Sequence, residues 1–165
     1  MAEPQHVRRA GRVLLLDGAG RVLLFRCHLV PEQPAATGWF TPGGGLADGE
    51  QPHQAAAREL REETGLAVAA GELGQPVIIS AGPAAPGRPD WFRDDIFLWR
   101  VGAHRVDTSR LEPRERAAII EHRWWPVAEL AVTTELVYPP GLTGLVTDLA
   151  AGRVPAEPAR LPWRY

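Results

Sequence analysis

The 165-residue chain contains no lysine, no asparagine and a single cysteine, Cys27. One cysteine excludes both an internal disulfide and a zinc site built from several cysteines. All 18 basic residues are arginines, so no mechanism of this protein can depend on a lysine amine. The scarcity of cysteine fits a reducing compartment.

Long apolar runs and a strong net charge are also missing. No segment approaches the roughly 20 consecutive apolar residues of a membrane-spanning helix. Residues 1–9 are polar and lack the apolar stretch of a signal peptide. The net charge of −2 gives no general attraction to nucleic acid or to anionic membranes. We therefore expect a cytoplasmic protein that binds neither a membrane nor a nucleic-acid polymer.

The composition that remains is that of an ordinary globular domain. Hydrophobic residues make up 45% of the chain and charged residues 23%. A chain of this length suits one domain with a hydrophobic core, so we treat residues 1–165 as a single domain. The proline-rich tail, residues 152–165, shows no readable pattern and receives no structural assignment.

Segments rich in valine and leucine, with turn residues between them, predict a β-hairpin near the start of the chain. Residues 7–16 and 21–26 are expected to be its strands, and residues 17–20 its turn. Residues 13–16 are apolar at every position, which favours a strand covered on both faces by helices. Further strands are expected at 39–41, 77–79, 96–101 and 123–125, with loops at 27–38 and 80–89.

Three helical segments are expected among these strands. The first begins at Pro52, which suits a first helical turn, and ends at Gly65, which suits the left-handed residue after a helix. A helical turn is expected at 127–130 and another helix at 140–151. The order of elements predicts an α+β sandwich with a mixed sheet.

The first helix carries three carboxylates on one side. Because each helical residue turns by about 100°, Glu59, Glu62 and Glu63 fall within an arc of roughly 100°. The like-charged pair Glu59–Glu63 costs about 0.2–0.5 kcal/mol, and negative charge at a helix C-terminus costs about 0.3–1 kcal/mol for each residue. A divalent cation would offset this repulsion, and Mg²⁺ and Mn²⁺ both prefer oxygen ligands. A solvated acidic surface is the alternative reading of the helix alone.

The spacing of residues 44–66 resembles the Nudix box, a motif of the Nudix hydrolase family. A glycine is followed at fixed intervals by glutamates, an arginine, leucines and a second glycine, and all nine defining positions match. The matching positions are Gly44, Glu50, Arg58, Glu59, Leu60, Glu62, Glu63, Gly65 and Leu66.

The resemblance implies an α/β/α sandwich around a mixed sheet. It also implies Mg²⁺- or Mn²⁺-dependent hydrolysis of a diphosphate that links a nucleoside to another group. Carried over by position, Glu59 and Glu63 would bind metal, and Glu62 would bind metal or position a water. The Gly44 carbonyl would complete the metal ligands, and Arg58 would hold Glu59 through a salt bridge.

Similar proteins often take their general base from a loop after the box. The candidates here are Glu112, Glu115 and Glu121, with Asp94 and Asp95 behind them. Glu115 and Glu121 are preferred. A solvated loop acid is the alternative for each one.

Substrate recognition is less readable from the sequence. Trp39 could stack on a base and Arg26 could bind a phosphate. Core packing of Trp39 and a solvated Arg26 are the alternatives.

Two functions fit the resemblance. The first is hydrolysis of a small nucleotide, either a nucleoside triphosphate or a nucleotide sugar such as ADP-ribose. The alternative is a non-catalytic module that senses a nucleotide. Homodimers are common among similar proteins.

Overall fold

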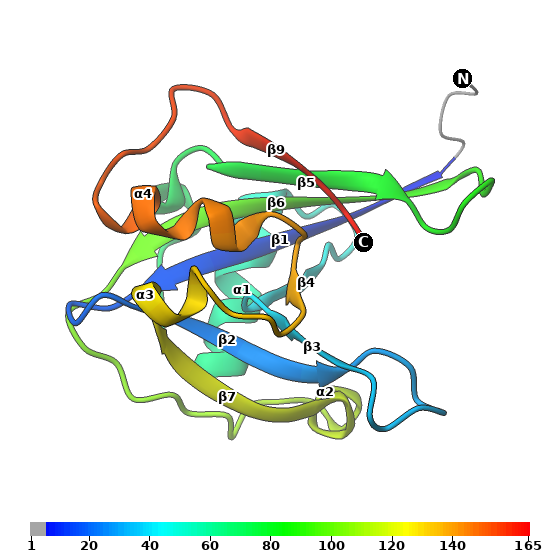
Figure 1. Cartoon of the computed structure of the whole chain (residues 1–165), viewed down its shortest axis with the longest axis horizontal. Helices are drawn as coiled ribbons and strands as arrows, with labels where there is room; N and C mark the ends of the chain where they lie inside the picture. Colours follow the sequence, from blue (N-terminus) through cyan, green and yellow to red (C-terminus); the bar gives the residue numbers. More distant parts are fainter. Residues whose placement is uncertain (1–5) are drawn as a thin grey trace.

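A mixed β-sheet of nine strands runs through residues 6–165, the part of the chain that the computed structural model describes (Figure 1). The strand order is β8-β3-β2-β1-β6-β5-β9, and β4 and β7 pair with β1 and β2, respectively. The strands are β1 (His6–Leu16), β2 (Arg21–His28), β3 (Thr37–Phe40), β4 (Gly43–Gly45), β5 (Ile78–Pro83), β6 (Asp90–Arg100), β7 (Ile119–Pro126), β8 (Val137–Tyr138) and β9 (Ala159–Pro162).

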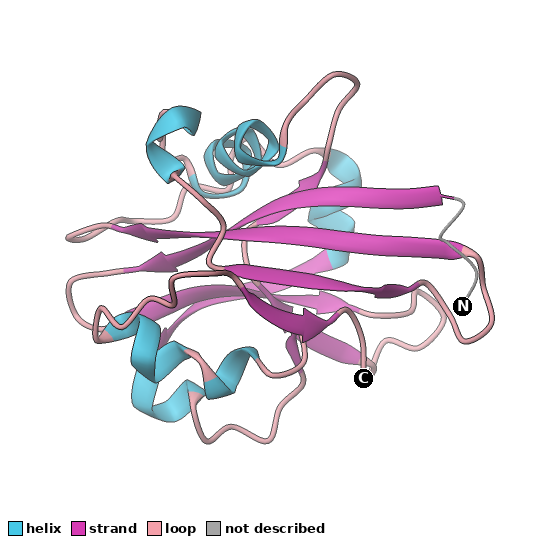
Figure 2. Ribbon diagram, turned by 90° about the horizontal axis from the view of Figure 1, so that it is seen from above, coloured by secondary structure: helices cyan, strands magenta, loops and turns pink. Residues whose placement is uncertain are grey.

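Helices cover both faces of this sheet (Figure 2). The long helix α1 lies on one face, and α3 and α4 lie on the other. The helical segments are α1 (Pro52–Thr64), η1 (Ala70–Leu73), α2 (Pro113–Ala118), α3 (Val127–Leu130), η2 (Leu142–Gly144) and α4 (Val146–Ala150). The arrangement confirms the predicted α+β sandwich around a mixed sheet.

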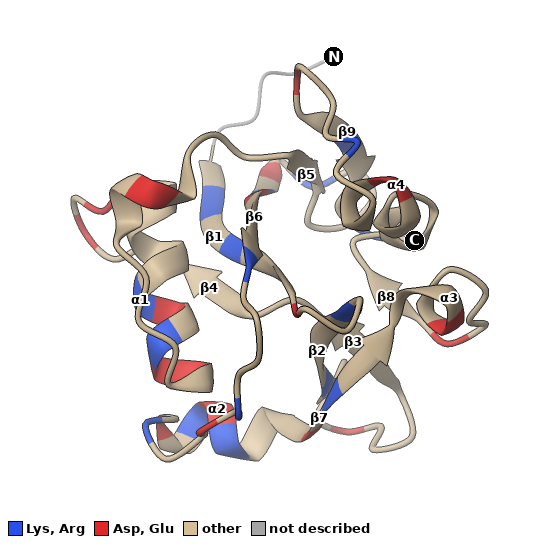
Figure 3. Cartoon of the chain, turned by 90° about the vertical axis from the view of Figure 1, so that its left-hand side faces the viewer, with Lys and Arg blue, Asp and Glu red and all other residues tan. Residues whose placement is uncertain are grey.

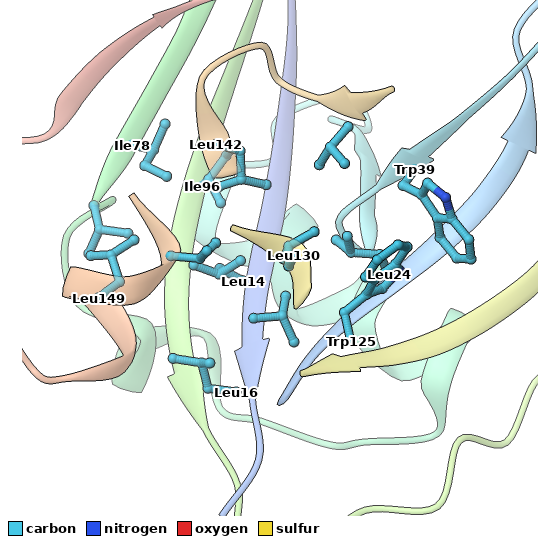
Figure 4. Packing of buried hydrophobic residues seen from close by; sticks show 14 residues of the cluster. Leu14, Leu16, Leu24, Trp39, Ile78, Ile96, Trp125, Leu130, Leu142 and Leu149 are labelled. Carbon is cyan, nitrogen blue, oxygen red and sulfur yellow. The ribbon is translucent and has the colours of Figure 1, made fainter. Parts of the chain in front are cut away.

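The central strand β1 contributes side chains to two separate hydrophobic cores. Leu14 and Leu16 point into the core beneath α3 and α4, where Leu130 and Leu149 also lie (Figure 4). Val13 and Leu15 point into the core beneath α1, where Leu60 of that helix also lies. The unbroken apolar run at 13–16 is therefore explained by helices on both sides of one strand, as the sequence predicts.

Helix α1 approaches β1 closely because residue 11 is glycine. A Cβ atom on Gly11 would overlap the carbonyl oxygen of Pro52 and lie 2.8 Å from the backbone nitrogen of Ala56. The helix begins at Pro52 and its C-cap is Gly65 with φ 76°, so both predicted ends are confirmed. This close packing fixes the carboxylate-bearing face of α1 relative to the sheet.

Several elements extend beyond or differ from the sequence prediction. Residues 80–83, expected in a loop, continue β5 because their backbone pairs with β6 in spite of Gly82 and Pro83. Strand β6 begins at Asp90 rather than at residue 96 and runs parallel to β1 along its whole length. The expected helix at 140–151 is split into η2 and α4, and the unassigned tail contributes β9, which pairs with β5.

Helix α2 lies in a region where no helix was predicted from the sequence.

None of the helices in the described residues 6–165 has the length and apolar character to cross a bilayer.

Candidate metal centre

The glycine-rich strand β4 places backbone atoms directly against the carboxylates of α1. A Cβ atom on Gly44 would lie 2.5 Å from Oε1 of Glu59, so a side chain at residue 44 would displace that carboxylate from its present position. The neighbouring Gly43 has φ 147°, a conformation that favours glycine, and its N–H donates to Oε2 of Glu63 at 2.8 Å. The glycines therefore set the distance between the strand and the acidic helix.

Three carboxylates from two helices lie close to one another. Oxygen atoms of Glu59, Glu62 and Glu115 all lie within 4.8 Å of one another. Helix α2 carries Glu115 and lies next to one end of α1 (Figure 3). Divalent cations of the oxygen-preferring kind bind such groups of carboxylates, so these residues can hold a metal ion.

Two of the three carboxylates on α1 are buried, and burial changes their acidity. Glu59 and Glu63 are only 7% and 8% exposed. Burial raises the pKa of Glu63 to about 8, and the negative charge of Glu59 adds to the increase. Burial also raises the pKa of Glu59, while its hydrogen bond to Arg58 opposes this. Without a cation nearby, the charged forms of both groups are disfavoured.

Arg58 connects the acidic residues around the site. Its guanidinium donates to Oε1 of Glu59 at 2.8 Å and to Oε2 of Glu62 at 3.3 Å. The same side chain pairs with Glu50 at 2.8 Å and donates to the Gly45 carbonyl at 3.1 Å. Arg58 thus holds Glu59 through the predicted salt bridge and also anchors the segment between β4 and α1.

A cavity of about 580 Å³ opens beside these carboxylates. Its volume lies within the range of about 300–1,000 Å³ found for small-molecule sites. Gly44, Glu59, Glu63 and Glu115 form part of its lining. The lining also includes apolar and aromatic residues, among them Phe25, Phe40, Ile119, Tyr138 and Trp163.

Trp39, Arg26 and Glu121, which were also named from the sequence, are not among the residues that line this cavity. Trp39 is 3% exposed and packs edge-on against Trp125 in the core, so its core-packing alternative describes its position. Arg26 pairs with Glu121 at 3.0 Å, and neither residue is among the described residues that line the cavity. Of the two preferred downstream acids, the structure brings Glu115 to the carboxylate group and leaves Glu121 away from it.

The sequence carries a start signal for helix α2 at residues 112–115. Glu112 and Glu115 form a reciprocal capping box, and Pro113 occupies the first helical position. The Glu112 N–H donates to Oε2 of Glu115 at 2.9 Å. This pattern predicts a helix start at residue 113, and it fixes Glu115 in a helix rather than in a loop.

A model of the NUDIX domain matches residues 6–141. The chain belongs to the Nudix family.

Two relatives of this Nudix chain are named RNA pyrophosphohydrolase. The one from Dinoroseobacter shibae is 39% identical over 89 residues, which are 54% of this chain and 46% of the relative. The one from Gluconacetobacter diazotrophicus is 36% identical over 101 residues, or 58% and 51% of the two chains. The Nudix chain thus matches about half the length of these relatives.

Solved structures share the fold at low sequence identity. The MutT protein from Methanosarcina mazei Go1 superposes with a TM-score of 0.67 at 18% identity, covering 92% of this chain and 98% of that one. The dihydroneopterin triphosphate pyrophosphohydrolase of E. coli gives a TM-score of 0.60 at 16% identity, covering 92% and 99%. At such identities the likeness shows the Nudix fold alone.

A methyl group at residue 44 should weaken metal binding although every carboxylate remains. In Gly44→Ala the new Cβ displaces the Glu59 carboxylate, and we expect Mn²⁺ affinity to fall by about 10–100-fold. Gly45→Ala is the matched control, because the nearest atom to its Cβ is the Arg9 carbonyl oxygen at 3.9 Å. Calorimetric Mn²⁺ titration of both variants measures the effect. Equal affinities in the two variants would contradict the proposed close approach.

The buried acid Glu63 should make the metal-free protein less stable as pH rises. Its folded pKa of about 8 lies above the ordinary value of 4.5, so the folded state binds the extra proton. The resulting loss of unfolding free energy develops from about pH 4.5 to about pH 8.

The variant Glu63→Gln isolates this contribution. In chelator, it should match wild type near pH 5 and be more stable by a few kcal/mol near pH 8.5, because a neutral amide replaces the buried charge. Denaturant unfolding at the two pH values measures the difference, with exposed Glu72→Gln as the control. A stability difference independent of pH would refute the raised pKa.

Proposed function

We propose that this Nudix chain is a pyrophosphohydrolase that acts with Mg²⁺ or Mn²⁺. Its substrate would be a nucleoside diphosphate linked to another group, and the bond cleaved would be the diphosphate linkage. The observation that carries this proposal is the meeting of Glu59, Glu62 and Glu115 within 4.8 Å beside a cavity of about 580 Å³. A solvated acidic surface needs neither the burial of Glu59 nor a carboxylate contributed by a second helix.

The proposed metal site consists of three glutamates of α1 and one backbone carbonyl of β4. Glu59, Glu62 and Glu63 would hold the cation, with the Gly44 carbonyl as a further ligand. When bound, the metal would shield the phosphate oxygens and lower the pKa of a water. Arg58 keeps Glu59 oriented toward the cavity, because one guanidinium bonds Glu59, Glu62 and Glu50 at once.

Glu115 is the proposed general base. It lines the cavity beside Glu59, and its Oε2 is oriented by the N–H of Glu112. A carboxylate within hydrogen-bond reach of the attacking water can accept its proton. Glu121, the other candidate, is committed to an ion pair with Arg26.

Two alternatives compete with the hydrolysis of a small nucleotide: a different substrate and a function without turnover. Triphosphorylated RNA is a second substrate candidate, because the relatives described above are named RNA pyrophosphohydrolase. A nucleotide-sensing module without turnover is the alternative outside enzymes. The four glutamates that define the box, Glu50, Glu59, Glu62 and Glu63, are all present, which favours catalysis.

Removal of the buried charges should abolish turnover. We expect the double variant Glu59→Gln, Glu63→Gln to lose hydrolysis by about three orders of magnitude or more, since metal binding and charge stabilisation are lost together. The assay follows product formation with Mg²⁺ on nucleoside triphosphates, nucleotide sugars and 5′-triphosphorylated RNA. Glu72→Gln, an exposed acid, is the control. Full activity in the double variant would disprove the site, and binding without turnover by wild type would favour the sensing module.

The two downstream acids should separate clearly in kinetics. Glu115→Gln should lower kcat by about 10²–10⁴-fold, because the proton acceptor is lost. Glu121→Gln should leave kcat within about twofold, because it breaks only an exposed ion pair. Rates at saturating substrate and Mg²⁺ compare the variants. If Glu121→Gln were the slower variant, the base assignment would be wrong.

A further inference from the structure

The last seven residues of the chain, 159–165, lie beyond the matched domain, which ends at residue 141, yet they reach the cavity. Trp163 and Arg164 line it together with Glu59 and Glu115. We propose that Arg164 is a substrate-binding residue that holds a phosphate oxygen of the nucleotide, and that Trp163 positions it. This inference rests on the proposed function, because it assigns the cavity to a nucleotide.

The chain before Arg164 is fixed to one end of the sheet. Strand β9 runs parallel to β5, and the Ser80 hydroxyl donates to the Pro162 carbonyl at 3.0 Å. The Trp163 ring then stacks on Phe92 with centroids 4.1 Å apart and planes at 12°. Aromatic stacking of this kind stabilises the ring's orientation. The backbone that carries Arg164 is therefore held in a defined position.

The chain after Trp163 reaches the opposite end of the strand order. Arg164 donates through Nη1 to the Ala84 carbonyl at 2.8 Å, and the Tyr165 hydroxyl donates to the Val137 carbonyl at 2.8 Å. Val137 belongs to β8, whereas β9 is the last strand at the other end. In Figure 1 the red C-terminal segment crosses in front of the sheet. The segment thus bridges the two ends of the curled sheet and forms a wall of the cavity.

This wall is distinct from the wall that carries the carboxylates. Glu59 and Glu63 come from α1 and Glu115 from α2, whereas Arg164 lies close to Tyr138 of β8. Burial raises the pKa of the Tyr138 hydroxyl, and the nearby positive charge of Arg164 acts in the opposite direction. A nucleotide in the cavity would meet acidic groups from α1 and α2 and this arginine from the C-terminal segment.

The charge balance of the cavity gives Arg164 its role. The lining carboxylates Glu59, Glu63, Asp94 and Glu115 would repel an anionic ligand. Arg12 lines the cavity too, but its guanidinium is paired with Asp94 at 2.7 Å. Among the lining residues of the described chain, Arg164 is the one arginine without a carboxylate partner.

A guanidinium in this position suits a phosphate. Arginine has five N–H donors, and the bond to Ala84 uses only part of that set. Its charge-assisted hydrogen bonds to phosphate oxygens are about twice as strong as neutral ones. Cations at the glutamates and the guanidinium of Arg164 would together offset the charge of a nucleotide.

Arg164→Ala, Arg164→Gln and Arg164→Lys test the proposal. Equilibrium binding of α,β-methylene-ATP to the Mn²⁺-loaded protein should weaken by about tenfold in the Ala and Gln variants. The Lys variant should recover part of the affinity, because it keeps the charge. Gln keeps a donor for the Ala84 carbonyl, so it separates lost charge from lost folding. Arg160→Ala is the matched control, since Arg160 is an exposed β9 residue that is not among the cavity-lining residues described.

Kinetics and binding together distinguish the two proposals. With an active wild type, Arg164→Gln should raise KM by about tenfold and leave kcat within about twofold. Nucleotide affinity within twofold of wild type in Arg164→Gln would overturn the role of Arg164 while leaving the hydrolase proposal intact. Nucleotide binding that depends on Arg164, without turnover of any substrate, would overturn only the hydrolase proposal. Absence of nucleotide binding by wild type would overturn both.

Discussion

Two glutamates buried side by side on one helix are the constraint on which the site depends. Glu59 and Glu63 are each less than a tenth exposed, one helical turn apart. Buried charges are costly unless they are paired or coordinate a metal. The protein supplies Arg58 to Glu59 and the Gly43 N–H to Glu63, but both carboxylates keep a raised pKa. This incomplete compensation is what a dication can relieve, and it links the folding energetics of α1 to the proposed chemistry.

The fold serves this constraint by assembling the site from distant segments. The β-sheet holds β4 against α1 so that glycine backbone, rather than side chains, faces the acids. Helix α2 adds Glu115 from a different part of the chain, and the C-terminal segment closes the cavity by linking β5 to β8. Residues placed on packed strands and helices hold their geometry better than residues on mobile loops. The acidic and basic walls of the cavity therefore belong to one framework.

The sequence revealed the parts of this framework that obey local rules. Pro52 and Gly65 marked the ends of α1, and the apolar run at 13–16 indicated a strand between two helical layers. Spacing alone placed Glu59, Glu62 and Glu63 on one side of the helix. Tertiary pairing decided the rest: β5 continues through Gly82 and Pro83 because β6 lies beside it. The tail pattern at 152–165 was unreadable for the same reason, since β9 is defined by its partner strand.

Side-chain environment was equally beyond the reach of local patterns. Trp39 was a reasonable stacking residue by type, but its neighbours place it in the core.

Crystals soaked with Mn²⁺ and recorded at a wavelength where manganese scatters anomalously test the central claim most directly. The account predicts an anomalous peak coordinated by oxygens of Glu59 and Glu62, near Glu115 and the Gly44 carbonyl. The account would be contradicted if no anomalous peak appeared at these carboxylates at saturating Mn²⁺, or if the peak lay elsewhere.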